Sequence, residues 1–289
     1  MIVVFNPVAG RRRAQALWHV LDLLLANGVR IQLAETRHPG HAEALARAAV
    51  CAGAELVVAA GGDGTIAEVA SGLMGSNVKL GVIPIGTANV LAHELDLPFA
   101  PIAVAAALAF GRTRKLWPGL ACWPDGARLF VQMLGVGFDA HVVHNLPIPL
   151  KQALGRTAYV LQALRDLPRY HFPSITLRID GMEFRASSVI VSKGRLYAGT
   201  HLLAPDARPD ERGFCITLFE NFGRAATFLY GAALPLDLLP HAPGVRQLRA
   251  REVVFTGNLP VPVQVDGDPA GFLPLHITDA AAPINIVMT

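Results

Sequence analysis

The 289-residue chain is rich in apolar residues (52%) and poor in charged ones (16%). This composition excludes an intrinsically disordered chain and predicts a compact core, and the length suits two domains. The net charge of +3 is too small to indicate a nucleic-acid partner, so we expect none. The three cysteines, Cys51, Cys122 and Cys215, form no CxxC pair, and we expect them to be reduced core residues.

No stretch of the sequence is long enough to suggest a membrane span. The longest apolar candidate, residues 97–110, contains Pro98 and Pro101 and is shorter than the roughly 20 residues that a crossing helix needs. Met1 leads directly into a strand-like run, without the basic segment and long apolar segment of a signal peptide. We therefore expect a cytoplasmic protein.

Strand and helix patterns alternate over about the first 111 residues. Strands are predicted at residues 2–5, 29–34, 56–60 and 80–83. Helices are predicted from about residue 14 to the Asn27-Gly28 stop, at 42–52, at 66–73, from about 89, and at 102–110. This alternation indicates βαβ units around a parallel sheet, and hence an N-terminal α/β domain over residues 1–115.

After the basic segment 112–115, strand patterns dominate. They cover residues 128–134, 174–179, 183–191, 214–219, 252–256 and 261–265. Asp180-Gly181 and Asp266-Gly267 are typical residue pairs of two-residue hairpin turns. We predict a larger, mostly antiparallel domain over residues 116–289, built as a β-sandwich or an open barrel.

One helix is predicted within this β-rich part. Its apolar stripe consists of Leu150, Leu154, Thr157, Leu161 and Leu164, and the basic residues elsewhere on it are Lys151, Arg156 and Arg165. Such a stripe usually packs onto a sheet, which is what we expect here. Contact with an anionic bilayer surface is the alternative, because basic amphipathic helices also bind there.

The segment Gly61-Gly62-Asp63-Gly64-Thr65 lies at a strand-to-helix junction. Glycines at such a junction let a ligand approach the backbone, and the first N–H groups of the helix favour anions such as phosphate. Asp63 would repel a phosphate unless a divalent cation, typically Mg²⁺, lies between them. The alternative is a tight turn in which Asp63 only caps the helix.

Three more loops follow strands at the same predicted edge of the sheet. They are Asn6-Pro7-Val8-Ala9-Gly10 with Arg11-Arg12-Arg13, the loop that begins at Glu35-Thr36, and Gly86-Thr87-Ala88-Asn89. Because ligands of open α/β sheets bind at the carboxyl ends of the strands, the four loops predict a site for a polyphosphate and a nucleoside. The three arginines in a first helical turn suit a nearby anion, or are simply solvated. His38 and His41 lack a further metal ligand nearby, and we expect Thr36 to contact the nucleotide instead.

These motifs, together with Glu68 and the late Asp266-Gly267-Asp268, occur in an order that resembles the catalytic domain of diacylglycerol and sphingolipid kinases in its small bacterial form. The resemblance spans nearly the whole chain. It implies an ATP-dependent lipid kinase with an ATP-binding α/β domain, a lipid-accepting β domain, and an active site between them. The residues implied to line the ATP and Mg²⁺ site are Asn6, Pro7, Gly10, Arg11, Thr36, Gly61, Gly62, Asp63, Gly64, Thr65, Glu68, Gly86, Thr87 and Asn89.

The resemblance assigns roles to two further aspartates. Asp268 would take the proton from the lipid hydroxyl, although the family more often has the longer glutamate at this position. The alternative is that Asp268 is simply part of a hairpin. Asp210 would help to hold a structural Mg²⁺, although Glu211 and Arg212 separate it from the glycine that normally follows. A surface turn rich in proline and aspartate is the alternative for that segment.

The substrate stays open on sequence grounds. Ala67, Val90 and His93 depart from residues that are common in bacterial diacylglycerol kinases, so ceramide, sphingosine, monoacylglycerol or a polyprenyl-type alcohol remain alternatives to diacylglycerol. NAD kinases share the GGDGT loop, and a non-catalytic lipid- or nucleotide-binding protein is a further alternative. No Walker A or protein-kinase motif occurs. The expected partner is a lipid met at the inner membrane face, and a homodimer is left open.

Overall fold

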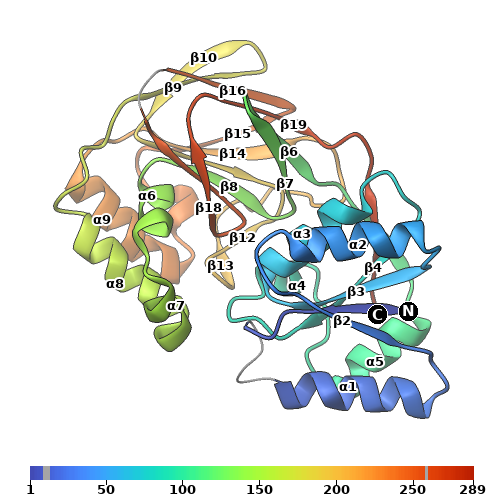
Figure 1. The fold of residues 1–289 in the computed structure, drawn as a ribbon. Coiled ribbons are helices and arrows are strands. Elements are labelled where there is room, and N and C mark those ends of the chain that lie inside the picture. The colour runs from blue at the N-terminus through green and yellow to red at the C-terminus, as the bar shows by residue number, and fades with distance from the viewer. Residues whose placement is uncertain (9–13, 258–259) are drawn as a thin grey trace. The chain divides into compact units, whose positions relative to one another are not determined.

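The computed structural model describes residues 1–8, 14–257 and 260–289 and divides into two compact units (Figure 1). The first unit contains Met1–Trp117 together with Ala281–Thr289. The second unit contains Pro118–Ala280. The chain therefore leaves the first unit once and returns to it with its last nine described residues.

The first unit is built on one six-stranded sheet with the order β2-β1-β3-β4-β20-β5. All neighbours pair in parallel except β20 and β5, which are antiparallel. The predicted parallel sheet is thus confirmed. Its strands are β1 (Ile2–Phe5), β2 (Gln32–Glu35), β3 (Leu56–Gly61), β4 (Lys79–Pro84), β5 (Thr113–Leu116) and β20 (Ile284–Val287).

Helices cover both faces of this sheet (Figure 1). On one face, α1 and α5 pack together, and the buried Leu17 and Leu24 of α1 join Val58 of β3 and Val104 of α5 in one apolar core. On the other face, α2 and α3 pack against each other and against β1 and β3. The helices are α1 (Ala14–Ala26), α2 (His41–Cys51), α3 (Asp63–Leu73), α4 (Val90–Glu94) and α5 (Pro101–Phe110).

Strand β2 begins later than the sequence pattern predicts. A strand over residues 29–34 was expected, but the N–H of Val29 donates to the carbonyl of Leu24 at 3.0 Å and so completes the end of α1. Gly28 reaches this conformation with a φ of +77°. Because the helix end uses the backbone of Val29, pairing with β1 starts only at Gln32.

The second unit contains two six-stranded antiparallel sheets. Their orders are β10-β9-β16-β19-β6-β7 and β15-β14-β11-β8-β17-β18. Side chains of both sheets, among them Leu177, Val191, Ile216 and Ile277, form one buried cluster, so the predicted sandwich is confirmed. The strands are β6 (Gly119–Trp123), β7 (Gly126–Phe130), β8 (Met133–Val136), β9 (Ile175–Ile179), β10 (Met182–Ala186), β11 (Ser188–Ser192), β12 (Leu196–Tyr197), β13 (His201–Leu202), β14 (Phe214–Phe219), β15 (Val245–Ala250), β16 (Glu252–Thr256), β17 (Pro262–Val265), β18 (Asp268–Phe272) and β19 (Leu275–Asp279).

Two predicted strands are each divided between the two sheets. The run 128–134 forms the end of β7 and the start of β8, because the backbone N–H groups of residues 131–133 donate to the carboxylate of Asp266. The run 183–191 is divided at Ser187, whose hydroxyl lies 2.9 Å from the carbonyls of both Phe219 and Asn221 and can donate to either. In both cases a side-chain hydrogen bond holds the crossing from one sheet to the other.

The helix predicted across residues 150–164 is two helices, separated at Gly155, where φ is +57°. Of the stripe expected to pack onto a sheet, Leu154, Leu161 and Leu164 are exposed, so that prediction is wrong. None of the helices formed by the described residues is long and apolar enough to cross a membrane. The helices of this unit are α6 (Phe138–Asn145), α7 (Ile148–Leu154), α8 (Arg156–Asp166) and α9 (Arg224–Ala233), with the 3-10 turns η1 (Leu234–Leu236) and η2 (Leu239–His241).

The cysteines differ in their surroundings. Cys215 is buried, Cys122 is half-buried, and Cys51 at the end of α2 is exposed. The expectation that all three are core residues is therefore wrong for Cys51. The alanine-rich face of α2 already supplies the buried contacts, through Ala42, Ala46 and Ala49.

Candidate functional site

The loops after β3 and β4 contact each other through glycines. A Cβ atom on Gly62 would lie 3.3 Å from the Cα of Gly86, and a Cβ on Gly86 would overlap the Cα of Gly62. The N–H of Gly86 donates to the carbonyl of Gly61 at 3.1 Å. Because no side chain stands between them, the two loops present bare backbone beside the start of α3, as close approach of a phosphate requires.

The loop after β1 is tied to the same place. The Asn6 side chain donates from Nδ2 to Thr65 Oγ1 at 3.1 Å, and its Oδ1 accepts the N–H of Val8 at 3.0 Å. Thr65 itself is buried in the first turn of α3. The structure thus brings Asn6 to the glycine loop as the sequence predicts, whereas Gly10 and the three arginines 11–13 lie outside the described residues.

Asp63 begins α3, and its side chain reaches the first turn of α4. Its Oδ1 accepts the N–H of Leu91 at 3.0 Å, near the start of α4. The residue is half-buried and acidic in the first turn of a helix, which is the favourable end for a negative charge. The N-cap of α3 is Gly62, so the alternative in which Asp63 caps its own helix is wrong; the carboxylate instead caps the start of α4.

Glu68 lies one turn further along α3, and both of its carboxylate oxygens contact the start of α2. Oε1 accepts the N–H of Gly40 at 2.8 Å, and Oε2 accepts the N–H of Ala42 at 3.1 Å. These two backbone groups have no partner within α2, because the first N–H groups of a helix never do. In this arrangement Glu68 caps α2 from the neighbouring helix and fixes the end of the loop that carries Thr36.

The loop after β4 contains one exposed and one buried candidate residue. Thr87 is exposed, whereas Asn89 is only 1% exposed and adopts a left-handed conformation with a φ of +47°. The Asn89 side chain donates to the carbonyls of Gly86 at 2.9 Å and Pro84 at 3.4 Å. Asn89 thus holds the shape of this loop from inside, and Thr87 is the side chain that can meet a ligand.

The loop after β2 is the least enclosed part of the predicted cradle. Thr36 is half-buried, and its N–H donates to the carbonyl of Phe5 at 2.8 Å. The His38 and His41 rings stack with centroids 4.9 Å apart, and His41 Nδ1 accepts the N–H of Arg37 at 3.1 Å. Within the described ranges no three His, Cys, Asp or Glu side chains gather as a metal site.

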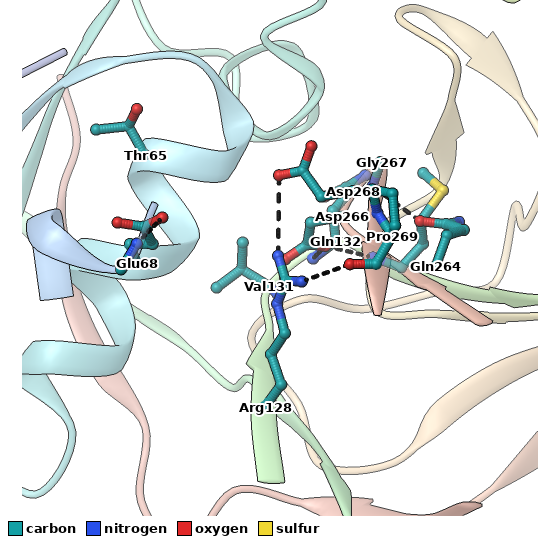
Figure 2. Close-up of polar contacts among 12 residues, drawn as sticks. Thr65, Glu68, Arg128, Val131, Gln132, Gln264, Asp266, Gly267, Asp268 and Pro269 are labelled. Atoms are coloured by element: carbon teal, nitrogen blue, oxygen red, sulfur yellow. Dashed lines mark hydrogen bonds and ion pairs between the residues drawn. The ribbon is translucent and has the colours of Figure 1, made fainter. Parts of the chain in front are cut away.

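In the second unit, β17 and β18 form a hairpin whose two-residue turn is Asp266-Gly267 (Figure 2). Both residues have positive φ, 48° and 83°, as the predicted turn requires. The Asp266 carboxylate accepts three backbone N–H groups, from Val131, Gln132 and Met133, each at 2.9 Å. Burial raises the pKa of the Asp266 carboxyl to about 6, although these hydrogen bonds lower it. Asp266 therefore anchors the turn to the crossing between β7 and β8.

Asp268 follows the turn, and two cations lie beside its carboxylate, Lys151 and the Arg128 that Figure 2 shows. Lys151 Nζ of α7 lies 3.2 Å from Oδ1, and Arg128 Nη2 of β7 lies 3.8 Å from Oδ2. Arg128 also donates to the carbonyl of Pro269 at 3.2 Å. Burial lowers the pKa of Lys151, but the charge of Asp268 and the neighbouring Tyr159 outweigh this and leave it above its usual value. The Asp268 side chain remains 40% exposed, so it can reach a bound molecule.

A second hydrogen-bonded chain supports the same turn. The N–H of Gly267 donates to Gln264 Oε1 at 2.8 Å, and Gln264 Nε2 donates to Asp139 Oδ2 at 2.9 Å. The hydroxyl of Tyr197 donates to the other oxygen of Asp139. Burial raises the pKa of Asp139, while these two hydrogen bonds lower it. The turn is thus fixed from two sides, which is what a positioned carboxylate at Asp268 needs.

Sequence reasoning missed several residues of this second site. Lys151 was assigned to a helix surface, Arg128 to a strand, and Asp266 only to a turn; Asp139 was not considered. One sequence signal did point to this site, namely Asp268. A hairpin turn needs only Asp266-Gly267, so a further aspartate directly after the turn suggests a functional carboxylate. Asp210, the other aspartate singled out, is half-buried in the segment before β14, and its charge partly opposes the lowering of the Lys193 pKa by burial.

Each of the two units is similar to a known protein family. The diacylglycerol kinase catalytic domain matches residues 1–120, and the YegS C-terminal NAD kinase beta sandwich-like domain matches residues 132–288. A diacylglycerol kinase of Bacillus subtilis (strain 168) is 27% identical over 99% of this chain and 95% of its own length. One from Staphylococcus aureus (strain MRSA252) is 28% identical over 99% and 93%.

Solved structures share the fold. A crystal structure from Bacillus anthracis str. Sterne superimposes with a TM-score of 0.81 at 19% identity, covering 100% of this chain and 94% of that one. A second from the same organism, described as a diacylglycerol kinase, gives a TM-score of 0.73 at 16% identity, with 100% and 96% covered. The chain belongs to the diacylglycerol kinase catalytic-domain family and carries the YegS-type C-terminal domain.

Proposed function

We propose that this protein is an ATP-dependent kinase that transfers the γ-phosphate of ATP to the hydroxyl of diacylglycerol. Membership of the family implies a lipid kinase that uses ATP. The observation that carries the proposal in this chain is the contact between the loops after β3 and β4, whose glycines leave no side chain between their backbones. Bare backbone beside the start of a helix suits a chain of phosphates.

In this proposal the first unit binds the nucleotide. Thr65, Asn6 and Thr87 lie where the loops after β1, β3 and β4 meet or end. Asp63 would hold Mg²⁺, and because no cluster of three metal-ligating side chains exists among the described residues, the phosphate oxygens and water would complete the coordination. When bound, the ion would neutralise charge on the transferred phosphoryl group.

Asp268 acts on the acceptor. The lipid hydroxyl gives its proton to the Asp268 carboxylate, its oxygen bonds to the γ-phosphorus, and the bond from that phosphorus to the bridging oxygen of ADP breaks. Lys151 and Arg128 hold the carboxylate in place, and the Asp266 and Gln264 hydrogen bonds fix the turn behind it. Aspartate is shorter than glutamate by one methylene, so the hydroxyl must come correspondingly close.

The test is transfer of label from [γ-³²P]ATP to a panel of acceptors in mixed micelles with Mg²⁺. The panel contains diacylglycerol, monoacylglycerol, sphingosine, ceramide and a polyprenyl alcohol, with NAD in parallel. Labelled phosphatidic acid as the main product supports the proposal. Preferential labelling of another lipid or of NAD would replace the substrate, and no labelling of any acceptor would favour a non-catalytic binding protein.

We further propose that the protein meets its lipid on an anionic membrane surface, from the cytoplasmic side, through α7 and α8. Helix α8 buries polar residues, since Gln162 donates to both oxygens of the buried Asp166 at 2.9 Å. Its apolar residues face outward instead: Val160, Leu161 and Leu164 are 59%, 47% and 52% exposed. Ile148 and Leu154 of α7 are exposed as well.

Charge favours an anionic bilayer as the partner of this face. Asp166 is the one acidic residue in the sequence from 146 to 179, and it is buried. The exposed charges of the two helices and the following turn are basic, namely Arg156, Arg165 and Arg169. Apolar side chains flanked by cations bind anionic interfaces by burial and by attraction together.

Co-sedimentation with phosphatidylcholine vesicles, with and without phosphatidylglycerol, tests this surface. We expect binding that requires the anionic lipid, weakens with salt, and is lost in Leu161→Gln/Leu164→Gln but not in Ile102→Gln, an exposed apolar residue of α5. Equal sedimentation of the double variant would contradict the assignment. So would a wild-type dimer that the same double substitution converts to a monomer, because the face would then join two copies of the chain.

A further inference from the structure

Lys193, the residue after β11, is completely buried in the second unit. Lysine is rarely found in such a place unless its charge is matched. Its Nζ donates to the backbone carbonyls of Glu211 at 2.9 Å and Gly213 at 2.8 Å, and to Asp279 Oδ1 at 3.2 Å. The Phe214 ring lies 5.0 Å from Nζ. The side chain therefore connects the segment before β14 to the end of β19.

The number of acceptors indicates the charge of the lysine. Three oxygens surround Nζ, and an ammonium group has three N–H donors to offer, whereas a neutral amine has only two and would turn its lone pair towards an oxygen. Burial lowers the pKa of Lys193 overall, although the charges of Asp279 and Asp210 oppose this shift. The geometry matches the protonated form, with Asp279 as its counter-ion.

This cation lies in the region where the family resemblance implies a structural Mg²⁺. Asp210, the residue expected to help hold that ion, is near enough for its charge to act on Lys193. The carbonyls of Glu211 and Gly213 and the carboxylate of Asp279 are the oxygens beside Asp210 that could have ligated Mg²⁺. All three accept hydrogen bonds from Nζ at 2.8–3.2 Å, so the ammonium group already occupies them.

The two residues that separate Asp210 from Gly213, and that depart from the family pattern, help to form the set of oxygens around Lys193. Glu211 and Arg212 separate Asp210 from Gly213, and the carbonyl of Glu211 is one of the three acceptors. Gly213, with a φ of +90°, supplies the second carbonyl, and its N–H donates to Asp279 at 2.8 Å. The two additional residues thus bring a backbone oxygen to the lysine.

We propose that the ammonium group of Lys193 takes the place of the structural divalent cation in the second unit, and that Asp210 binds no Mg²⁺. The unit then carries its own cation as part of the chain. Any requirement of this protein for Mg²⁺ belongs to the nucleotide alone.

Thermal unfolding of the full chain without nucleotide, in excess EDTA and in millimolar Mg²⁺, tests the proposal. We expect the wild type to unfold at the same temperature in EDTA and in Mg²⁺. If Mg²⁺ raises the wild-type unfolding temperature slightly, we expect the same small rise in Asp210→Asn. Lys193→Met should unfold at a clearly lower temperature in both buffers, because two carbonyls and the Asp279 carboxylate lose their hydrogen bonds from Nζ. Lys115→Met, on the exposed strand β5, is the matched control and should unfold as the wild type does.

Two results would overturn the proposal. The first is a rise of the wild-type unfolding temperature with Mg²⁺ that Asp210→Asn abolishes. The second is a Lys193→Met variant as stable as the wild type. If Lys193→Met yields no folded protein, the comparison of the wild type with Asp210→Asn still decides between a bound Mg²⁺ and a resident ammonium group.

Discussion

The carboxylate of Asp266 makes stability depend on pH in a predictable direction. Burial raises its pKa from the usual 3.8 to about 6 in the folded protein. The folded state therefore binds more protons than the unfolded state between about pH 4 and 6, and the unfolding free energy falls as the pH rises through this window. A difference of about two pKa units, at about 1.4 kcal/mol each, amounts to about 3 kcal/mol.

Asp266→Asn isolates this contribution, because all other titrating groups are shared with the wild type. Urea unfolding of both proteins from pH 4.5 to 7.5 gives the wild-type advantage at each pH. We expect that advantage to shrink by about 2 kcal/mol over this range, because pH 4.5 already lies above the unfolded-state pKa. An advantage that is constant, or that grows with pH, would show that the three backbone N–H groups stabilise the ionised form more than burial destabilises it, and would refute the reasoning.

Three further substitutions test the first unit. Gly86→Ala should lower stability by about 1–3 kcal/mol, since its Cβ meets the backbone of Gly62, and should weaken ATP binding; Gly231→Ala, with open space on α9, should do neither. Glu68→Gln should cost about 1–3 kcal/mol in urea unfolding, because an amide cannot accept both N–H groups of α2. Weaker ATP binding at unchanged stability would instead identify Glu68 as a ligand. Asp63→Asn should abolish the effect of Mg²⁺ on ATP affinity in calorimetry, and an unchanged Mg²⁺ effect would remove Asp63 from the metal site.

Much of the fold follows from local patterns, and the failures have identifiable causes. The alternation of strands and helices, the parallel sheet and the two Asp-Gly turns were all predictable, because each depends on neighbouring residues. The break between β7 and β8 was not, since Val131-Gln132-Met133 continues an alternating pattern, and the carboxylate that captures these amides is about 135 positions away. Nothing in the four residues of β20 indicates that this strand joins the sheet of the first unit and not one of the second unit's sheets.

The residues of the candidate site also divide into those that local sequence patterns reveal and those that depend on distant contacts. The glycine loops and Asp268 could be found because their motifs are contiguous in sequence. Lys193 could not, because it follows a strand as a solvated lysine commonly does, and its acceptors are 18, 20 and 86 residues away. The orientation of α8 was predicted wrongly because apolar residues were assumed to face inward. Its buried face instead contains Gln162 and Asp166, which are hydrogen-bonded to each other.

The central claim, that Asp268 takes the proton from the lipid hydroxyl during phosphoryl transfer, is tested most directly by Asp268→Asn. Turnover of diacylglycerol and ATP affinity are measured on the same preparation. We predict that turnover falls by about 10²–10⁴-fold while ATP affinity is unchanged. Turnover equal to that of the wild type would contradict the account.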